Sequence, residues 1–236
     1  MEAFVSLWSA DPLALGVAVR QVEDLVDGFH IDVFDGHNVP DLLFGPDLVA
    51  ALHGFTTARI EVHLNVTDPD YWIDRFAEAG ASIITVQSGP CRDVPTVLEH
   101  IRARGCEAGL GIELHEPTAI AARLLPLASR LLLLGTPIGV RGQQLDPSAP
   151  ARVRELVALR ARVGGEVTRR PPIAVDGGIR RHTVPVLAAA GADGIIPGSL
   201  VFGANDPRGA LAEIAALTAG VPVPAESAFW IMQAPA

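Results

Sequence analysis

Short runs of apolar and β-branched residues recur along the chain and predict β-strands. Eight runs have this character, at residues 4–9, 29–33, 60–64, 83–86, 108–112, 131–134, 173–175 and 194–196. Most of them are apolar throughout and do not alternate, which is typical of strands in a parallel sheet whose outer face is covered by helices. The pattern therefore predicts an α/β protein with a parallel sheet.

Segments with helical spacing lie between the predicted strands. Two of them carry the apolar sets Val17, Val22, Leu25 and Val26, and Val153, Leu156, Val157 and Val163. Gly164-Gly165 follows the second set as a stop signal, and Gly80 and Gly191 each lie between two alanines, where a helix would turn tightly into the next strand. Eight strand–helix units close naturally into a barrel, whereas a doubly wound sheet normally has about five to seven strands. We therefore predict a single (β/α)8 TIM barrel.

Length and composition fit one domain. The chain has 236 residues, of which 49% are hydrophobic, and a barrel of this type takes about 250 residues. We assign residues 1–220 to the barrel and residues 221–236 to a C-terminal tail. Because the tail contains Phe229 and Trp230, we expect it to pack on the barrel or on a neighbouring subunit, with a frayed terminus as the alternative.

Charge and cysteine usage narrow the class of protein. The formal net charge is −9 without any block of like charge, which argues against a nucleic-acid partner. The chain opens without a basic signal region, and its most apolar stretches carry Arg123 or Arg130 before they reach the roughly 18 residues of a membrane span. We therefore expect a cytoplasmic protein that does not associate with membranes. Cys91 and Cys106 lack CxxC spacing and are expected to be buried thiols, with a disulfide as the alternative.

All 18 basic residues are arginine, and the chain contains no lysine. Schiff-base aldolases form their covalent intermediate on a lysine amine, and some decarboxylases use a lysine as proton donor. The sequence excludes both of these barrel chemistries.

Four residues at predicted strand ends have side chains that ligate metals. His30 and Asp32 end the second predicted strand, His63 the third and Asp176 the seventh. The i, i+2 spacing points His30 and Asp32 to the same side of their strand, and the strand ends of a barrel converge on one mouth. Taken singly, each histidine could be a hydrogen-bonded core residue, and Asp176 could cap a turn. Burying all four side chains without a shared partner, however, would cost free energy. We therefore predict one divalent metal ion, Zn²⁺, Mn²⁺, Fe²⁺ or Co²⁺, bound by these side chains.

Glycine-rich turns follow the last three predicted strands, at residues 139–143, 176–179 and 197–199. Glycine lets backbone N–H groups approach an anion closely, and a phosphate site after the last two strands is common in barrels. Each turn alone could be a plain turn, but three on neighbouring strands favour a phosphate-bearing ligand.

Six motifs occur in a fixed order along the chain. They are SLWSAD at residues 6–11, HIDVFDGHNVP at 30–40, FGP at 44–46, VHL at 62–64, VDGGI at 175–179 and GS at 198–199. In this order they resemble the ribulose-phosphate 3-epimerase family over nearly the whole chain. The HIDxxDGxxVP block, with the downstream histidine and the DGGI turn, is the specific part of the resemblance.

The resemblance implies a barrel of the ribulose-phosphate-binding type, one divalent metal and epimerisation at C3 of a ketose phosphate through an enediolate. His30, Asp32, His63 and Asp176 match the family's metal ligands. Asp32 and Asp176 also match its acid/base pair, which acts on opposite faces of the substrate. The residues expected to bind substrate, from the resemblance and the glycine turns, are Ser6, Asn65, Arg141, Gly142, Gln143, Gly177, Gly178, Gly198 and Ser199.

The chain departs from the family pattern around the expected substrate. Phe34 and Asn65 stand where the family usually has methionine, and Trp8 where it usually has a smaller apolar residue. PIGVRGQ replaces the usual PGFGGQ and introduces Arg141, while Gln87 stands where a histidine is usual. We interpret retained ligands with changed surroundings as an altered substrate. Asn65 and Gln87 could hydrogen-bond a hydroxyl, and Arg141 could bind an anionic group or be a solvent-exposed loop residue.

We therefore expect a metal-dependent epimerase, with D-ribulose 5-phosphate and D-xylulose 5-phosphate as the default pair. The enzymatic alternative is an epimerase or aldose–ketose isomerase acting on a related four- or six-carbon sugar phosphate. The alternative from another class is a non-catalytic sugar-phosphate-binding barrel. The expected partner is a small phosphorylated ketose, and we expect a homo-oligomer.

Overall fold

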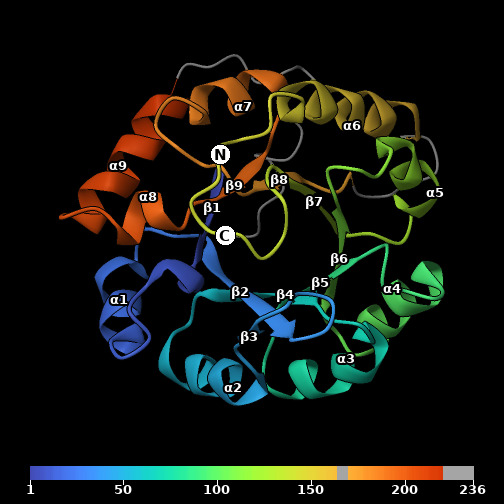
Figure 1. Ribbon diagram of the computed structural model, residues 1–236, viewed down its shortest axis with the longest axis horizontal. Coiled ribbons are helices and arrows are strands. Elements are labelled where there is room, and N and C mark those ends of the chain that lie inside the picture. Colours follow the sequence, from blue (N-terminus) through green and yellow to red (C-terminus); the bar gives the residue numbers. More distant parts are fainter. Residues whose placement is uncertain (164–169, 220–236) are drawn as a thin grey trace.

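The computed structural model describes residues 1–163 and 170–219, and in this part of the chain eight parallel strands close into a barrel (Figure 1). The strands are β1 (Glu2–Ser6), β2 (Gly28–Asp35), β4 (Arg59–Asn65), β5 (Ile83–Gln87), β6 (Glu107–Ile112), β7 (Arg130–Leu134), β8 (Ile173–Asp176) and β9 (Gly194–Ile196). Pairing of β1 with both β9 and β2 closes the ring. The predicted (β/α)8 TIM barrel is confirmed.

Helices surround the barrel and cover its outer face (Figure 1). They are α1 (Leu15–Val22), α2 (Pro46–Phe55), α3 (Pro69–Glu78), α4 (Val94–Ala103), α5 (Ala121–Leu124), α6 (Ala149–Val163), α7 (Val184–Ala190), α8 (Ser199–Phe202) and α9 (Pro207–Thr218), with short 3-10 turns η1 (Leu7–Ser9) and η2 (Thr118–Ile120). Six of these helices carry proline in the first turn, where the missing N–H has no intrahelical partner to lose. Buried aliphatic side chains of the strands and helices form one continuous core between the two layers.

The predicted strand positions are confirmed, and most bounds differ by one or two residues. The first strand is the exception, because the chain leaves β1 at Ser6 and forms η1 over the residues predicted as its second half. A further strand, β3 (Leu42–Leu43), was not predicted. It pairs antiparallel with the end of β2, and two residues are too short a run to give a periodic signal.

The helical sets are only partly confirmed. In α6, Val153 and Leu156 are buried, whereas the side chain of Val163 and the stop signal Gly164-Gly165 lie outside the described residues. In α1, Val22 of the predicted set is buried, but Val17 is 62% exposed and Leu25 lies beyond the helix end with 44% exposure. The buried face of α1 consists of Val22 together with Ala18 and Val19.

The two glycines flanked by alanines make the tight turns predicted for them. Gly80 and Gly191 have φ of +97° and +99°, a left-handed conformation that residues with a Cβ rarely adopt.

Both cysteines are free thiols, and Cys106 is buried while Cys91 is half-buried. The predicted tail at residues 221–236 lies outside the described residues, so the domain boundary stays a prediction. Among the described helices, none has the length and apolar character to cross a bilayer.

Side chains that point into the barrel are of two kinds. A small apolar cluster is formed by Phe4, Ile83, Leu132, Ala174 and Ile196. The others are buried polar side chains, among them Glu61, Thr85 and Gln87. Gly109 and Gly111 of β6 make room for Thr85 and Gln87, since a Cβ at either glycine would lie within 2.5 Å of Thr85 Oγ1 or Gln87 Nε2.

Candidate active site

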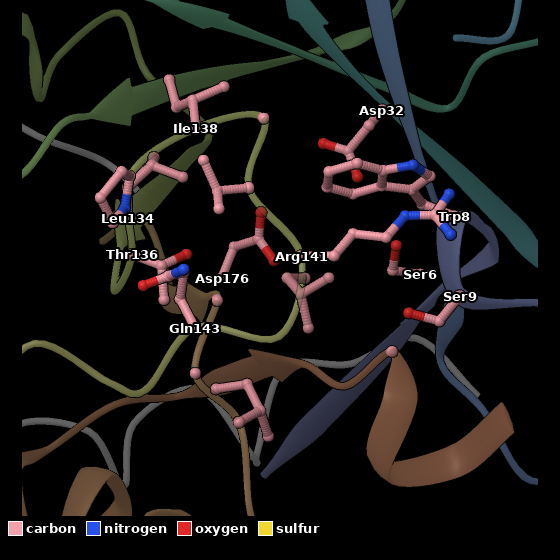
Figure 2. A pocket seen from close by; sticks show the side chains of 18 of the residues that line it. Ser6, Trp8, Ser9, Asp32, Leu134, Thr136, Ile138, Arg141, Gln143 and Asp176 are labelled. Carbon is pink, nitrogen blue, oxygen red and sulfur yellow. The ribbon is translucent and has the colours of Figure 1, made fainter. Parts of the chain in front are cut away.

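A cavity of about 340 Å³ opens at the carboxyl-terminal ends of the strands (Figure 2). We call its deep part the floor, which consists of Asp32, His63, Asn65 and Asp176. We call its outer part the rim, which consists of Trp8, Ser9 and residues 137–143, 177–180 and 198–199. The floor side chains come from strands, and the rim comes from the segments that follow strands β1, β7, β8 and β9.

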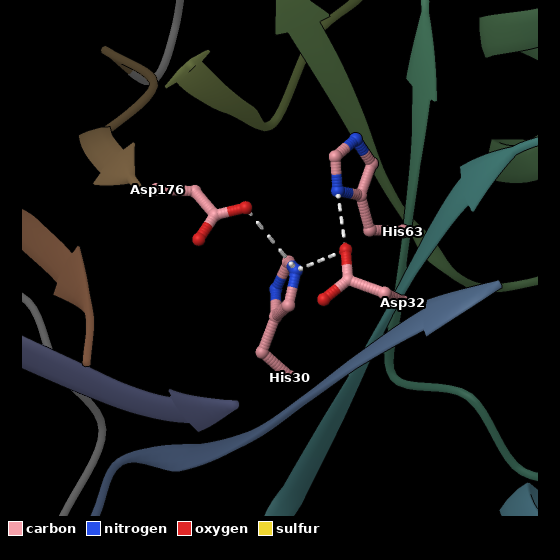
Figure 3. Close-up of side chains that lie close together, drawn as sticks. All are labelled: His30, Asp32, His63 and Asp176. Atoms are coloured by element: carbon pink, nitrogen blue, oxygen red, sulfur yellow. Dashed lines mark hydrogen bonds and ion pairs between the residues drawn. The ribbon is translucent and has the colours of Figure 1, made fainter. Parts of the chain in front are cut away.

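The four predicted metal ligands come together at the floor (Figure 3). One ligand atom from each of His30, Asp32, His63 and Asp176 lies within 4.8 Å of all the others. Asp32 Oδ1 lies 3.2 Å from His63 Nδ1 and 3.4 Å from His30 Nε2, and Asp176 Oδ2 lies 3.9 Å from His30 Nε2. Asp32 is paired in register with His63 across β2 and β4, so the pleat puts both side chains on the inner face.

The two carboxyl groups of the cluster have opposite electrostatic character. Burial alone would raise the pKa of Asp32, but the charge and hydrogen bond of His30 outweigh it and hold this pKa far below its usual range. Burial dominates at Asp176 and raises its pKa to about 6. Burial would lower the pKa of His30, yet the Asp32 carboxylate raises it well above the ordinary value. Two neighbouring carboxyl groups whose pKa values are shifted in opposite directions are typical of acid/base pairs.

Each histidine of the cluster has a partner on its second ring nitrogen. His30 Nδ1 lies 3.2 Å from Glu61 Oε2, and His63 Nε2 lies 2.6 Å from Gln87 Nε2. Gln87 Oε1 has no hydrogen-bond partner among the described residues. If His63 Nδ1 gives its lone pair to a metal, Nε2 carries the proton, and rotating the amide of Gln87 brings Oε1 round to accept it. Two imidazoles and two carboxylates, with these partners, fit a borderline divalent cation.

Asn65 lies beside the cluster and faces the cavity. Its Nδ2 donates to Asp32 Oδ1 and to the His63 carbonyl oxygen, both at 3.4 Å. Asn65 is fully buried, and its Oδ1 has no hydrogen-bond partner among the described residues. An amide oxygen in this position can accept a hydrogen bond from a hydroxyl in the cavity.

The rim glycines have the conformations that close approach of backbone requires. Gly177 and Gly178 have φ of +89° and +69°, and a Cβ on Gly178 would lie 2.5 Å or less from backbone atoms of Leu145. Gly142 has φ of +77°, and a Cβ on Gly198 would meet Ser9 Oγ at 2.5 Å. The three turns predicted to bind phosphate therefore meet at the same opening.

Arg141 spans part of this opening (Figure 2). Its guanidinium lies over the ring of Trp8, 4.6 Å from the ring centroid. Trp8 in turn packs edge-on against Phe34, with 5.1 Å between the two ring centroids. The Arg141 residue is exposed, and no salt bridge to it occurs within the described ranges. Trp8 and Phe34 thus form an aromatic support that keeps a cation at the mouth.

Comparison with known proteins assigns the chain. The family described as "Ribulose-phosphate 3 epimerase family" matches residues 3–202. The chain belongs to this family. It is 33% identical over 210 residues to the ribulose-phosphate 3-epimerase of Bacillus subtilis (strain 168), covering 89% of this chain and 95% of the relative. It is 36% identical over 201 residues to that of Rhodobacter capsulatus, covering 84% of each. The expectation of an isomerase of the carbohydrate epimerase type is confirmed at the level of the family.

Solved structures extend the likeness in fold. The 3-hexulose-6-phosphate synthase of Salmonella typhimurium superposes with a TM-score of 0.67 at 22% identity, over 94% of this chain and 100% of that chain. The orotidine 5'-phosphate decarboxylase of Pyrococcus horikoshii OT3 gives 0.64 at 17% identity, over 93% and 100%. At these identities the likeness concerns the barrel alone.

Most residues predicted for the epimerase site line the cavity. Asp32, His63 and Asp176 line it, and so do all nine predicted substrate-binding residues, which are Ser6, Asn65, Arg141, Gly142, Gln143, Gly177, Gly178, Gly198 and Ser199. His30 lies behind Asp32 and does not line the cavity. Gln87 corrects a prediction, because its side chain contacts His63 instead of reaching the cavity. The space beside Gly111 allows this position.

Four charged residues at or near the site were not predicted, and one of them, Arg180, lines the cavity itself. Glu61 contacts His30, and Arg130 lies 3.3 Å from Glu61. The sequence did carry a signal, since Glu61 is two positions before His63 and shares its inward face. Asp35 accepts hydrogen bonds from the backbone N–H groups of residues 37, 38 and 67 and orders the loop after β2.

Proposed function

We propose that this member of the ribulose-phosphate 3-epimerase family is a metal-dependent epimerase that inverts C3 of a ketose phosphate. D-ribulose 5-phosphate and D-xylulose 5-phosphate are the default pair, because relatives carry the name of that activity. The observation that carries the proposal is the convergence of two histidines and two aspartates of unlike pKa at the floor of one cavity. The ion, Zn²⁺, Mn²⁺, Fe²⁺ or Co²⁺, would be held by His30, Asp32, His63 and Asp176.

Inversion at carbon needs a proton removed from one face and another delivered to the opposite face. Asp32 and Asp176 project from β2 and β8, two strands separated by β1 and β9 in the barrel order. One carboxylate takes the C3 proton, and the other carboxyl group, protonated, returns one from the far side. When bound, the metal stabilises the negative charge that develops on the substrate oxygens as the proton leaves. Asn65 Oδ1 accepts a hydrogen bond from a substrate hydroxyl.

The rim supplies binding for the other end of the substrate. Backbone N–H groups at Gly142, Gly177, Gly178 and Gly198 bind the phosphate oxygens, with Ser199 at the start of α8 and Ser6 and Gln143 close by. This arrangement keeps the phosphate away from the two aspartates. Binding energy gained at the rim then orients C3 between the acid and the base.

Deuterium exchange tests the proposal. The protein is loaded with each of the four metals in turn and incubated in D₂O with a panel of four-, five- and six-carbon ketose phosphates, and exchange is followed by NMR. We expect deuterium at C3 together with the C3 epimer, and loss of both in Asp176→Asn. Deuterium at C1 or C2 with an aldose product would identify the aldose–ketose isomerase instead. A loaded protein that exchanges no substrate proton would identify the non-catalytic binder.

Substrate choice is a second part of the proposal. Trp8, supported by Phe34, takes up volume at the mouth, and Asn65 offers a hydrogen-bond acceptor where the family usually has a thioether. Asn65 favours a substrate with an oxygen that a thioether would not contact, as in a four- or six-carbon ketose phosphate, and Trp8 favours a shorter or differently oriented sugar over the default pentuloses. We expect kcat/KM for D-ribulose 5-phosphate to lie below that for at least one other member of the panel and to rise in Asn65→Met. If kcat/KM is highest for D-ribulose 5-phosphate and does not rise in Asn65→Met, the pentulose phosphate is the preferred substrate and this part of the proposal is wrong.

A further inference from the structure

A line of buried charged groups runs from the metal cluster towards the other end of the barrel. Glu61 lies behind His30 and is fully buried. Its Oε2 lies 3.2 Å from His30 Nδ1, and its Oε1 accepts a hydrogen bond from Thr85 Oγ1 at 2.8 Å. Arg130 Nε lies 3.3 Å from the same Oε1 atom. Both carboxylate oxygens of Glu61 therefore have partners in the barrel interior.

Arg130 continues this line. Only 2% of its side chain is exposed, and its guanidinium lies 4.5 Å from the centroid of the Phe4 ring. Its Nη1 donates to Glu2 Oε2 at 2.9 Å, and the Glu2 side chain is 34% exposed. Arg130 is the first residue of β7, and Glu2 is the first residue of β1. The sequence of contacts His30, Glu61, Arg130, Glu2 thus reaches solvent near the amino-terminal ends of the strands.

Fold stability does not explain these groups. Two charges removed from water lose hydration, and well-packed apolar residues of similar volume often replace a buried ion pair without loss of stability, or with a gain. Apolar residues, Phe4 among them, fill other positions of the same barrel interior, so apolar packing suits this interior. The arrangement of Glu61 points instead to His30, which it contacts on the nitrogen facing away from Asp32 and Asp176.

The geometry determines which nitrogen of His30 carries the proton. An ionised carboxylate only accepts hydrogen bonds, so a neutral His30 beside Glu61 carries its proton on Nδ1. Its lone pair is then on Nε2, the atom that lies 3.4 Å from Asp32 Oδ1 and 3.9 Å from Asp176 Oδ2. The same hydrogen bond fixes the rotation of the ring. Carboxylates placed in this way behind ligating histidines orient the ligand, and their removal typically weakens metal binding by about 10- to 100-fold.

We propose that Glu61 and Arg130 are positioning residues that present His30 Nε2 to the metal. Glu61 sets the tautomer and ring orientation, and Arg130 holds the Glu61 carboxylate in place from the opposite side. The inference rests on the proposed function only in requiring that the cluster binds a divalent ion. His63 differs from His30, because its second nitrogen faces the neutral amide of Gln87.

Metal affinity and histidine tautomers test this inference separately from turnover. Co²⁺ is titrated into the full chain, and binding is followed by visible absorption and equilibrium dialysis. In the metal-free protein, at a pH high enough for His30 to be neutral, the ring nitrogens of His30 are observed by long-range ¹H–¹⁵N NMR. We compare Glu61→Gln, Arg130→Met and the double variant Glu61→Leu/Arg130→Met with the wild type. Arg160→Met is the matched control, since Arg160 is a buried arginine that pairs with Asp193 away from the cluster.

We expect the Kd for Co²⁺ to rise about 10- to 100-fold in Glu61→Gln and in the double variant, and by less in Arg130→Met. His30 should lose its single Nδ1–H tautomer in the double variant, where no acceptor faces Nδ1, and Arg160→Met should change neither measurement. The double variant removes both buried charges together and leaves only Glu2, which is partly exposed, without its partner, so the test stays valid if a single variant fails to fold. A folded double variant that binds Co²⁺ as tightly as the wild type overturns the inference and leaves the proposed function standing. A wild type that binds no Co²⁺, Zn²⁺, Mn²⁺ or Fe²⁺ overturns both.

Discussion

The floor and the rim of the cavity are built in different ways. Floor side chains come from strands, and Asp32, His63 and Asn65 are at most 5% exposed, with hydrogen bonds that link them to one another. The rim consists of turns with left-handed glycines, and one of its two charged side chains, Arg141, is exposed. The pleat of the strands fixes the chemistry of the floor, whereas backbone conformation fixes the shape of the rim.

This difference separates two properties of the enzyme. A substitution at the floor disturbs groups that already depend on one another, so we expect it to change metal binding or turnover. A substitution at the rim changes a side chain with few protein contacts, so we expect it to change substrate affinity. The following predictions test this division, from the largest expected effect to the smallest.

The largest effect is expected at Asp176. Replacement by Asn keeps the size of the side chain but removes the acid/base group, so kcat should fall by at least about 100-fold, the usual scale for general acid/base catalysis. Metal content is measured on the same sample, so that loss of the ion is distinguished from loss of the proton transfer. A metal-loaded Asp176→Asn enzyme with near-normal kcat would contradict the role proposed for the floor.

A smaller effect is expected at Gln87, which lies behind the floor. Gln87→Leu removes the acceptor for His63 Nε2–H, and the Kd for Co²⁺ should rise by about tenfold. Gln87→Glu supplies an acceptor again and serves as the matched variant, with affinity at or above that of the wild type. Equal affinities for Gln87→Leu and the wild type would show that His63 needs no partner on its second nitrogen.

At the rim, the test residue is Arg141. Exposed charged contacts contribute about 1 kcal/mol or less, so Arg141→Ala should raise KM for the phosphorylated substrate by about fivefold and leave kcat and metal content unchanged. Arg20→Ala is the control, because Arg20 also stacks on an aromatic ring, that of Phe55, at 4.0 Å, but does not line the cavity. A fall in kcat with constant KM would place Arg141 with the floor and break the division.

The smallest effect concerns the loop after β2. Burial would raise the pKa of Asp35, but the N–H groups of Thr67, His37 and Asn38 outweigh it and lower this pKa well below the ordinary value. A carboxyl group with a depressed folded-state pKa contributes stability above its unfolded pKa of about 3.9 and loses it as the pH falls through the folded value. Asp35→Asn should therefore lower Tm slightly at pH 6 to 7, and the difference should shrink below about pH 4. If the Tm difference between Asp35→Asn and the wild type grew on acidification, ionised Asp35 would not be the form that stabilises the loop.

The sequence predicted the floor better than the groups that support it. Strand ends and the i, i+2 spacing were sufficient to bring His30 and Asp32 to one face, and the barrel brought His63 and Asp176 to them. The partners Glu61 and Arg130 lie on β4 and β7, which are separated by two strands of the barrel, and no local pattern reports a contact across its interior. Gln87 was wrongly expected in the cavity, because the room beside Gly111 depends on packing between β5 and β6.

For the rim, the sequence predicted the individual turns but not the contacts between side chains of different turns. Glycine positions indicated where the backbone could approach an anion, and all of them line the cavity. The stacking of Arg141 on Trp8 joins residues far apart in sequence, and it depends on the chain leaving β1 at Ser6 to form η1. The extended strand predicted for residues 4–9 would have continued past this position.

The closure of the barrel through β1 has a consequence for folding during synthesis. Strands β5 to β9 each pair with the strand that precedes them and β4 pairs with β2, but β1 also pairs with β9, the last of the described strands along the chain. On the ribosome, one side of β1 therefore lacks its partner until residues 194–196 have emerged. Asp176 lies on β8, and Trp8 directly follows β1, so both wait for this late pairing to reach their final places. The floor and the rim are therefore completed together, only after β9 has been synthesised.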